Sequence, residues 1–121
     1  MRRGFRVVSV AVSALAIVGA IGCSSTVVAA GGKKMSGKEL AFNKKKGNCL
    51  ACHLIAGGKQ AGTIAPPLIA MKARFPKKAT LRSQIEDARK KNPDSMMPPF
   101  KPHGILSDKE ISLVVDFIYG L

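Results

Sequence analysis

Apolar and polar positions along the chain predict a series of short helices, and the clearest of them lies at the C-terminal end. Ser107 and Glu110 form a capping box there, in which each side chain satisfies a free backbone amide at the helix start. The apolar positions that follow at helical spacing are Ile111, Val114, Val115, Ile118 and Leu121, with Phe117 beside them. Such a helix must bury its apolar face, and we expect its partner to be the first helix of the domain.

That first helix begins at a second capping box, formed by Ser36 and Glu39. We expect it to continue to the lysine run at 44–46, because cations are favourable where the helix dipole is negative. Gly47 then provides the residue type that commonly follows a helix end. The lysine run is interpreted as a solvated helix end, and a docking role is the alternative.

Two shorter helices are predicted in between. Residues 57–67 are rich in Gly and Pro and cannot hold regular structure. A short helix is expected to begin at Leu68 and to end before Pro76, and another is expected over 80–91 with Thr80 as its N-cap. The apolar positions of the latter are Leu81, Ile85 and Ala88. Because no strand-like alternation or internal repeat occurs, the sequence predicts an all-α domain of four to five short helices.

The first 30 residues are predicted to be a secretory signal. Three arginines precede an apolar run over 7–21 that is too short for a membrane span, and small residues at 28–30 offer a cleavage site. The folded domain is then 31–121, exported to the periplasm. Cys23 falls inside the signal and is expected to be discarded with it; a lipid anchor at Cys23 is the alternative.

The chemistry of the domain is concentrated in Cys49-Leu50-Ala51-Cys52-His53. Two cysteines separated by two residues and followed by histidine are typical of c-type haem attachment. Each thiol adds to one vinyl group of the porphyrin, so Cys49 and Cys52 are predicted to hold the haem covalently. His53 then lies under the iron as its proximal ligand.

Other uses of this motif fit less well. Zinc needs four ligands, and His103 is the one further Cys or His residue in the domain. A thioredoxin-like dithiol needs a βαβ setting, and a disulfide across two intervening residues is strained. A domain this short also buries a modest core, so we expect the haem-free chain to be largely disordered.

Two further residues are candidates for the iron site. Met97 precedes Pro98 and Pro99, which stiffen a loop that can bring a thioether to the face opposite His53. Met96 is then its packed neighbour; the alternative is that both methionines only line the pocket, and His103 is expected at the surface. Pro66 is placed so that its carbonyl can accept a hydrogen bond from the other nitrogen of His53, although it can also be an ordinary loop proline.

The whole pattern resembles the class I cytochrome c fold. More narrowly, the segments that are similar to the SoxX family are 47–53, 61–68, 71–76, 97–100 and 105–107. SoxX is the monohaem subunit of the SoxAX complex of bacterial thiosulfate oxidation. Ala65 departs from the glycine that cytochromes often have before the proline, which leaves the turn geometry there to be tested.

The resemblance implies one haem c with His53 and Met97 as axial ligands and an electron-relay role in a periplasmic L-cysteine S-thiosulfotransferase. The implied partners are a SoxA-like dihaem or monohaem subunit that carries the catalytic haem, the SoxYZ carrier protein, and a soluble cytochrome acceptor. The carrier cysteine of SoxYZ is joined oxidatively to thiosulfate, and this chain accepts the electrons. No residue of this chain is then catalytic.

Charge agrees with such a role. Removal of the three signal arginines lowers the formal net charge from +13 to +10, and a basic surface speeds encounter with acidic partners and anionic substrates. Nucleic-acid binding is excluded by export and by the lack of a recognition motif. The alternative function is a free-standing periplasmic electron carrier.

Overall fold

The computed structural model describes residues 34–121, and the predicted signal segment and Cys23 lie outside these residues. Its elements are α1 (Gly37–Phe42), a 3₁₀ turn η1 (Cys49–Ala51), α2 (Met71–Arg74), α3 (Lys78–Glu86), a 3₁₀ turn η2 (Ala88–Lys90) and α4 (Asp108–Tyr119). The described part contains no strand, which confirms the predicted all-α class. No helix within it is long and apolar enough to cross a membrane.

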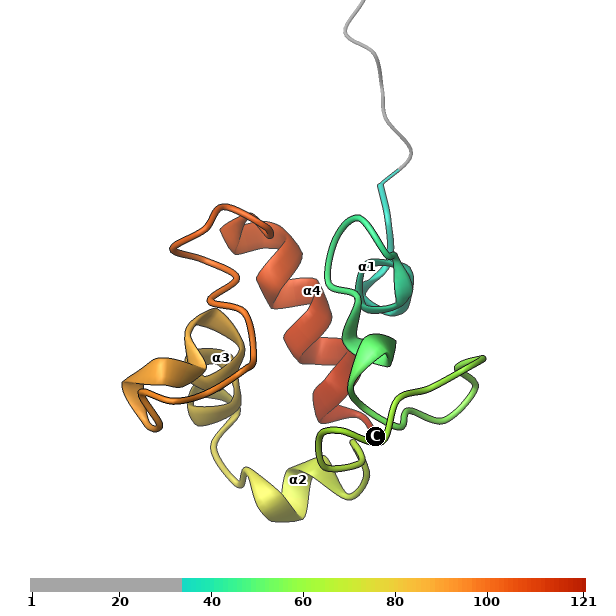
Figure 1. Ribbon diagram of the computed structural model, residues 1–121, viewed down its shortest axis with the longest axis horizontal. Coiled ribbons are helices and arrows are strands. Elements are labelled where there is room, and N and C mark those ends of the chain that lie inside the picture. The colour runs from blue at the N-terminus through green and yellow to red at the C-terminus, as the bar shows by residue number, and fades with distance from the viewer. Residues whose placement is uncertain (1–33) are drawn as a thin grey trace, which may run out of the picture. The chain divides into compact units, whose positions relative to one another are not determined.

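The longest helix, α4, is the central element of the domain. In Figure 1 it runs between α1 and α3, with α2 near its C-terminal end, and all three helices contact it. The predicted stripe is buried at Ile111, Val114, Val115 and Ile118. The helix starts at its capping box as expected, since the Ser107 amide donates to Glu110 Oε2 at 2.8 Å and the Glu110 amide donates to Ser107 Oγ at 3.3 Å.

Helix α1 packs directly on α4, as the sequence predicts. Its first residue, Gly37, lies so close to the α4 backbone that a Cβ there would overlap the carbonyl of Leu113. Phe42 and Phe117 close the contact edge-to-face, with ring centroids 5.9 Å apart. The absence of a side chain at one position therefore sets how closely the two helices approach.

The predicted extension of α1 to the lysine run at 44–46 is wrong. The helix ends before Asn43, whose side-chain Oδ1 accepts the Lys45 amide at 2.8 Å and so offers the backbone an alternative to the helix. Gly47 is not the residue that stops the helix. Instead its amide donates to the carbonyl of Leu40 at 3.0 Å, which folds the lysine turn back onto α1.

The short helix begins later than predicted. The amide of Leu68 donates to the carbonyl of Leu54 at 2.9 Å, which holds residues 68–70 outside α2. Ala70 then has a left-handed backbone with φ 49°, and helical structure starts only at Met71. A left-handed residue cannot belong to a right-handed helix, so the helix cannot extend back through Ala70 to Leu68.

The third helix differs from the prediction at both ends. It begins at Lys78, so Thr80 lies inside it and is not its N-cap. It also stops before Asp87, whose side chain accepts the Arg89 amide at 3.2 Å and caps the separate turn η2. The predicted apolar positions are nevertheless correct, because Leu81, Ile85 and Ala88 are all buried.

Candidate functional site

A cavity lined by the residues of both sequence motifs lies among α2, α3, α4, η1 and the loops that precede and follow α3. It measures about 170 Å³, and about 750 Å³ when the space out to its mouth is counted, and its walls are mostly apolar. Sites for cofactors and drug-sized ligands commonly span about 300–1,000 Å³ with a few polar groups among apolar walls. The polar and sulfur-bearing residues on the walls are Cys49, His53, Arg74, Gln84 and Met97, with Met71 beside Arg74.

His53 is held on the cavity wall from two sides. Its amide donates to the carbonyl of Cys49 at 2.9 Å, which continues the turn η1. Its Nδ1 lies 2.7 Å from the carbonyl oxygen of Pro66. Because a carbonyl oxygen can only accept, Nδ1 carries the proton in this contact, and Nε2 keeps the lone pair that a metal ion requires.

The Ala65-Pro66-Pro67 segment brings that carbonyl into place. The Ala65 amide donates to the carbonyl of Cys52 at 3.0 Å, so the segment runs beside the cysteine motif. Ala65 is not among the residues with positive φ. An alanine therefore fits where the resemblance led us to look for glycine, and the departure does not disturb this turn.

The two cysteines occupy one turn and are not joined by a disulfide. Cys49 lines the cavity, and burial, followed by the nearby Cys52 thiol, raises the pKa of Cys49 to about 11 against the opposing effect of a backbone hydrogen bond. A thiol with that pKa is protonated at neutral pH.

No group of three or more His, Cys, Asp or Glu residues in residues 34–121 could hold a metal ion.

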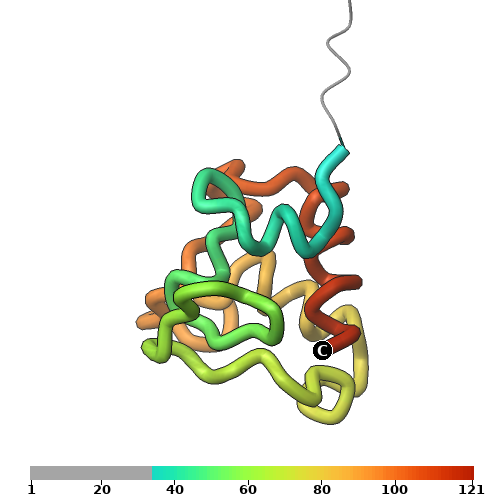
Figure 2. Tube along the Cα trace, turned by 90° about the vertical axis from the view of Figure 1, so that its right-hand side faces the viewer, coloured from blue at the N-terminus to red at the C-terminus, as the bar shows by residue number. Residues whose placement is uncertain are grey.

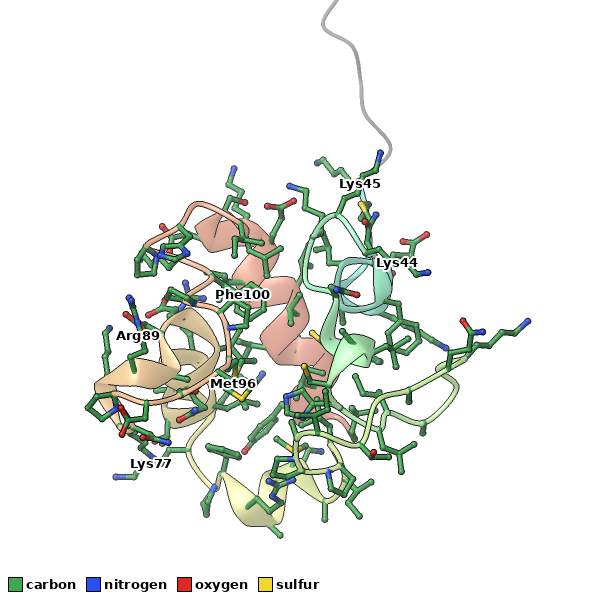
Figure 3. All side chains as sticks on the ribbon, viewed as in Figure 1. Lys44, Lys45, Lys77, Arg89, Met96 and Phe100 are labelled. Atoms are coloured by element: carbon green, nitrogen blue, oxygen red, sulfur yellow. The ribbon has the colours of Figure 1, made fainter. Side chains whose placement is uncertain are left out.

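The two methionines of the second motif have different surroundings. Met97 lines the cavity with His53, and its amide donates to Ser95 Oγ at 3.2 Å. Met96, labelled in Figure 3, is 86% exposed, so the prediction that it packs beside Met97 is wrong. Phe100 is buried and anchors the loop, since its carbonyl accepts the amide of Ile105 at 2.9 Å.

His103 lies away from these groups. It is exposed and does not line the cavity. Its amide donates to the carbonyl of Pro99 at 3.1 Å, which places it in the turn after the methionine loop. The structure thus brings together Cys49, His53, Pro66 and Met97.

Sequence reasoning missed Arg74, the one charged side chain on the cavity wall. Its Nη1 donates to the carbonyl of Pro67 at 2.7 Å and lies 3.6 Å from the sulfur of Met71. This guanidinium ties α2 to the segment that supports His53. The spacing of three residues between Met71 and Arg74 places both on one side of a helical turn and was the available signal.

These residues suit a covalently attached haem. Two thiols stand on one turn at the required spacing, and the histidine directly after them has one ring nitrogen bound to a carbonyl and the other available. The soft thioether of Met97 lines the same cavity. The residues that line the cavity include no carboxylate.

Comparison with known proteins agrees with this arrangement. A family model described as Cytochrome c matches residues 34–121, which is the whole described part of the chain. A search of curated proteins finds no match. The family implies a covalently bound haem c, for which Cys49, Cys52 and His53 have the required spacing.

Proposed function

The chain belongs to the cytochrome c family, and within it we propose an electron-transfer role as the monohaem subunit of a periplasmic SoxAX-type complex. Bound haem c supplies a one-electron couple between ferric and ferrous iron. The observation that carries the proposal is the presence of His53 and Met97 on the walls of one cavity. His53 and Met97 would together hold the iron of a bound haem, which would leave no open position for substrate.

The residues of this chain then attach the haem, orient its histidine ligand and enclose it. Cys49 and Cys52 form the two thioether bonds. Pro66 accepts the Nδ1 proton of His53, which fixes the tautomer and keeps the ring electron-rich. Met97 provides a soft neutral ligand that favours ferrous iron. The apolar walls exclude water, which keeps the reorganisation on electron transfer small.

Bond formation belongs to the partner in this proposal. Joining thiosulfate to the carrier thiol of SoxYZ forms one sulfur–sulfur bond and releases one proton and two electrons. The two electrons reach this chain one at a time through the SoxA-like subunit and leave to a soluble cytochrome. The chain is thus part of an L-cysteine S-thiosulfotransferase without holding its catalytic residues.

A free-standing periplasmic carrier is the second candidate. It is favoured by the breadth of the family match, which covers residues 34–121 without pointing to a subfamily. The two candidates differ in whether the protein forms a stable complex. The haem protein should be exported alone and together with a SoxA-like cytochrome of the same organism. If the protein stays monomeric in the mixture, and thiosulfate and SoxYZ together never reduce its haem, it is the free-standing carrier.

The distal ligand can be tested separately. We expect Met97→Ala to abolish the sulfur-to-iron charge-transfer absorption of the oxidised protein, because it removes the thioether that lines the cavity. Met96→Ala is the matched control, since the neighbouring side chain is exposed. Retention of the band in Met97→Ala would show that another residue is the ligand.

A further inference from the structure

One stretch of the domain is almost without charge. Residues 47–71 contain a single basic residue, Lys59, and none of the seven acidic residues of the chain. The flanking sequence is strongly basic, with the lysine run at 44–46 before the stretch and Lys72 and Arg74 directly after it. Charged residues normally cover the surface of a small protein, so their absence here requires an explanation.

The stretch forms two neighbouring runs of backbone. Amides of residues 62, 65 and 68 donate to the carbonyls of Leu50, Cys52 and Leu54 at 2.7, 3.0 and 2.9 Å. The second run therefore follows the first in the same direction. Figure 2 shows both as green to yellow-green tubes that cover one side of the domain.

Large apolar side chains project from these runs into solvent. Leu54 is 53% exposed, Ile64 is 73% exposed and Ile69 is 56% exposed, and these are three of the five large hydrophobic residues exposed in the described part of the chain. Pro66 and Pro67 between them are exposed as well. We call the surface formed by Leu54, Ile64, Pro66, Pro67 and Ile69 the neutral face.

The neutral face adjoins the cavity, because Pro66 belongs both to this face and to the cavity wall. Cys49, His53, Pro66 and Leu68, which line the cavity, come from the same two runs. A partner on the neutral face thus lies next to the cavity wall. Close approach matters for a protein that transfers electrons without moving atoms, and the absence of charge removes the cost of desolvating ions on contact.

The surroundings of the neutral face indicate the kind of partner. No acidic residue occurs between Glu39 and Glu86, whereas the exposed Arg74 donates to the carbonyl of Pro67 and so places a cation at the edge of the neutral face. The cores of protein interfaces are depleted in charge, and their rims are polar. A complementary surface therefore has an uncharged apolar centre and an acidic rim.

We propose that the neutral face docks the haem-carrying partner subunit through such a surface. The inference rests on the proposed function, because it names the face by which this subunit joins its complex. The basic rim steers the encounter and sets its salt dependence. The apolar centre provides the affinity that remains at high salt.

Two lysine substitutions separate the centre from general charge effects. Ile64→Lys places a charge within the neutral face, whereas Leu113→Lys adds the same charge at an exposed leucine of α4, a helix that contributes nothing to the neutral face. Both increase the net positive charge equally. We expect Ile64→Lys to weaken binding of the SoxA-like cytochrome at least tenfold and Leu113→Lys to change it less than twofold, measured by calorimetry on haem-loaded proteins.

Further measurements make each outcome decisive. Ile69→Lys should weaken binding like Ile64→Lys, and an unchanged charge-transfer band shows that each variant keeps its haem site. Wild-type affinity in both neutral-face variants overturns the docking face while the proposed function stands. Absence of binding by the wild type overturns both. Self-association of the purified protein that Ile64→Lys abolishes would make a second copy the occupant and would also overturn the proposal.

Discussion

The close approach of α1 and α4 depends on Gly37, and substitution of this residue sets two effects against each other. Alanine is the better helix former by up to about 1 kcal/mol. However, a Cβ at Gly37 would lie 2.6 Å from the carbonyl carbon of Leu113 and 2.9 Å from Cβ of Phe117. A backbone carbonyl cannot rotate away, so the two helices must separate.

The cost of that separation decides whether Gly37→Ala raises or lowers the free energy of unfolding. Leu40 and Ala41 are 1% and 0% exposed, and both face the contact that would open. Overpacking of this kind costs about 1–3 kcal/mol, which exceeds the gain in helix propensity. We therefore expect Gly37→Ala to lower the free energy of unfolding by up to roughly 2 kcal/mol, after subtraction of that gain.

Denaturant unfolding of the haem-loaded protein, followed by circular dichroism, measures this change as a lower midpoint at unchanged slope. Gly120→Ala is the matched control. Gly120 has φ −82°, and its Cβ would meet nothing closer than 3.4 Å. Its midpoint should therefore stay within experimental error or rise. Equal or greater stability of Gly37→Ala would refute the argument that this contact sets the helix spacing.

Two further predictions concern the haem and the pH. A Cys49→Ala, Cys52→Ala chain is expected to be largely disordered by circular dichroism, because without haem the apolar walls of the cavity would face water; native helicity would contradict this. The pKa of Glu110 is lowered from its ordinary 4.5, mainly by the hydrogen bond with Lys46 and next by the backbone amide of Ser107. The stabilisation that this carboxylate provides is therefore complete above pH 4.5 and is lost as the pH falls through the lower pKa of the folded state. On acidification, the denaturant midpoint of Glu110→Gln should fall less than that of the wild type. An identical fall would exclude this contribution.

The helix starts that carry a capping box could be predicted from the sequence, whereas the other helix boundaries could not. Both capping boxes form as expected, because each is complete within four residues and needs no tertiary contact. The ends of α1 and α3 were misplaced because Asn43 and Asp87 take backbone amides with their own side chains. Hydrophobic spacing continues through both positions and gives no sign of this competition.

The site shows the same division between local and distant information. The spacing of Cys49, Cys52 and His53 is itself the signal, so the attachment motif was readable. Arg74 was not predicted, because its role arises from a hydrogen bond to Pro67 that only the folded chain creates. The neutral face could have been noticed as a charge-free stretch, but its exposure required the structure.

The irregular stretch before α2 explains why the site can exist at all. A carbonyl inside a helix is already bound to an amide four residues later, so one of its two lone pairs is occupied. Proline has no amide hydrogen and forces the preceding residue into extended backbone, so consecutive Pro66 and Pro67 cannot form a regular helix there. Their carbonyls are therefore available, one to His53 Nδ1 at 2.7 Å and the next to Arg74 at 2.7 Å. The same absence of helix leaves the apolar side chains of the neutral face without a covering element, so the support of His53 and the exposed surface outside it have one cause.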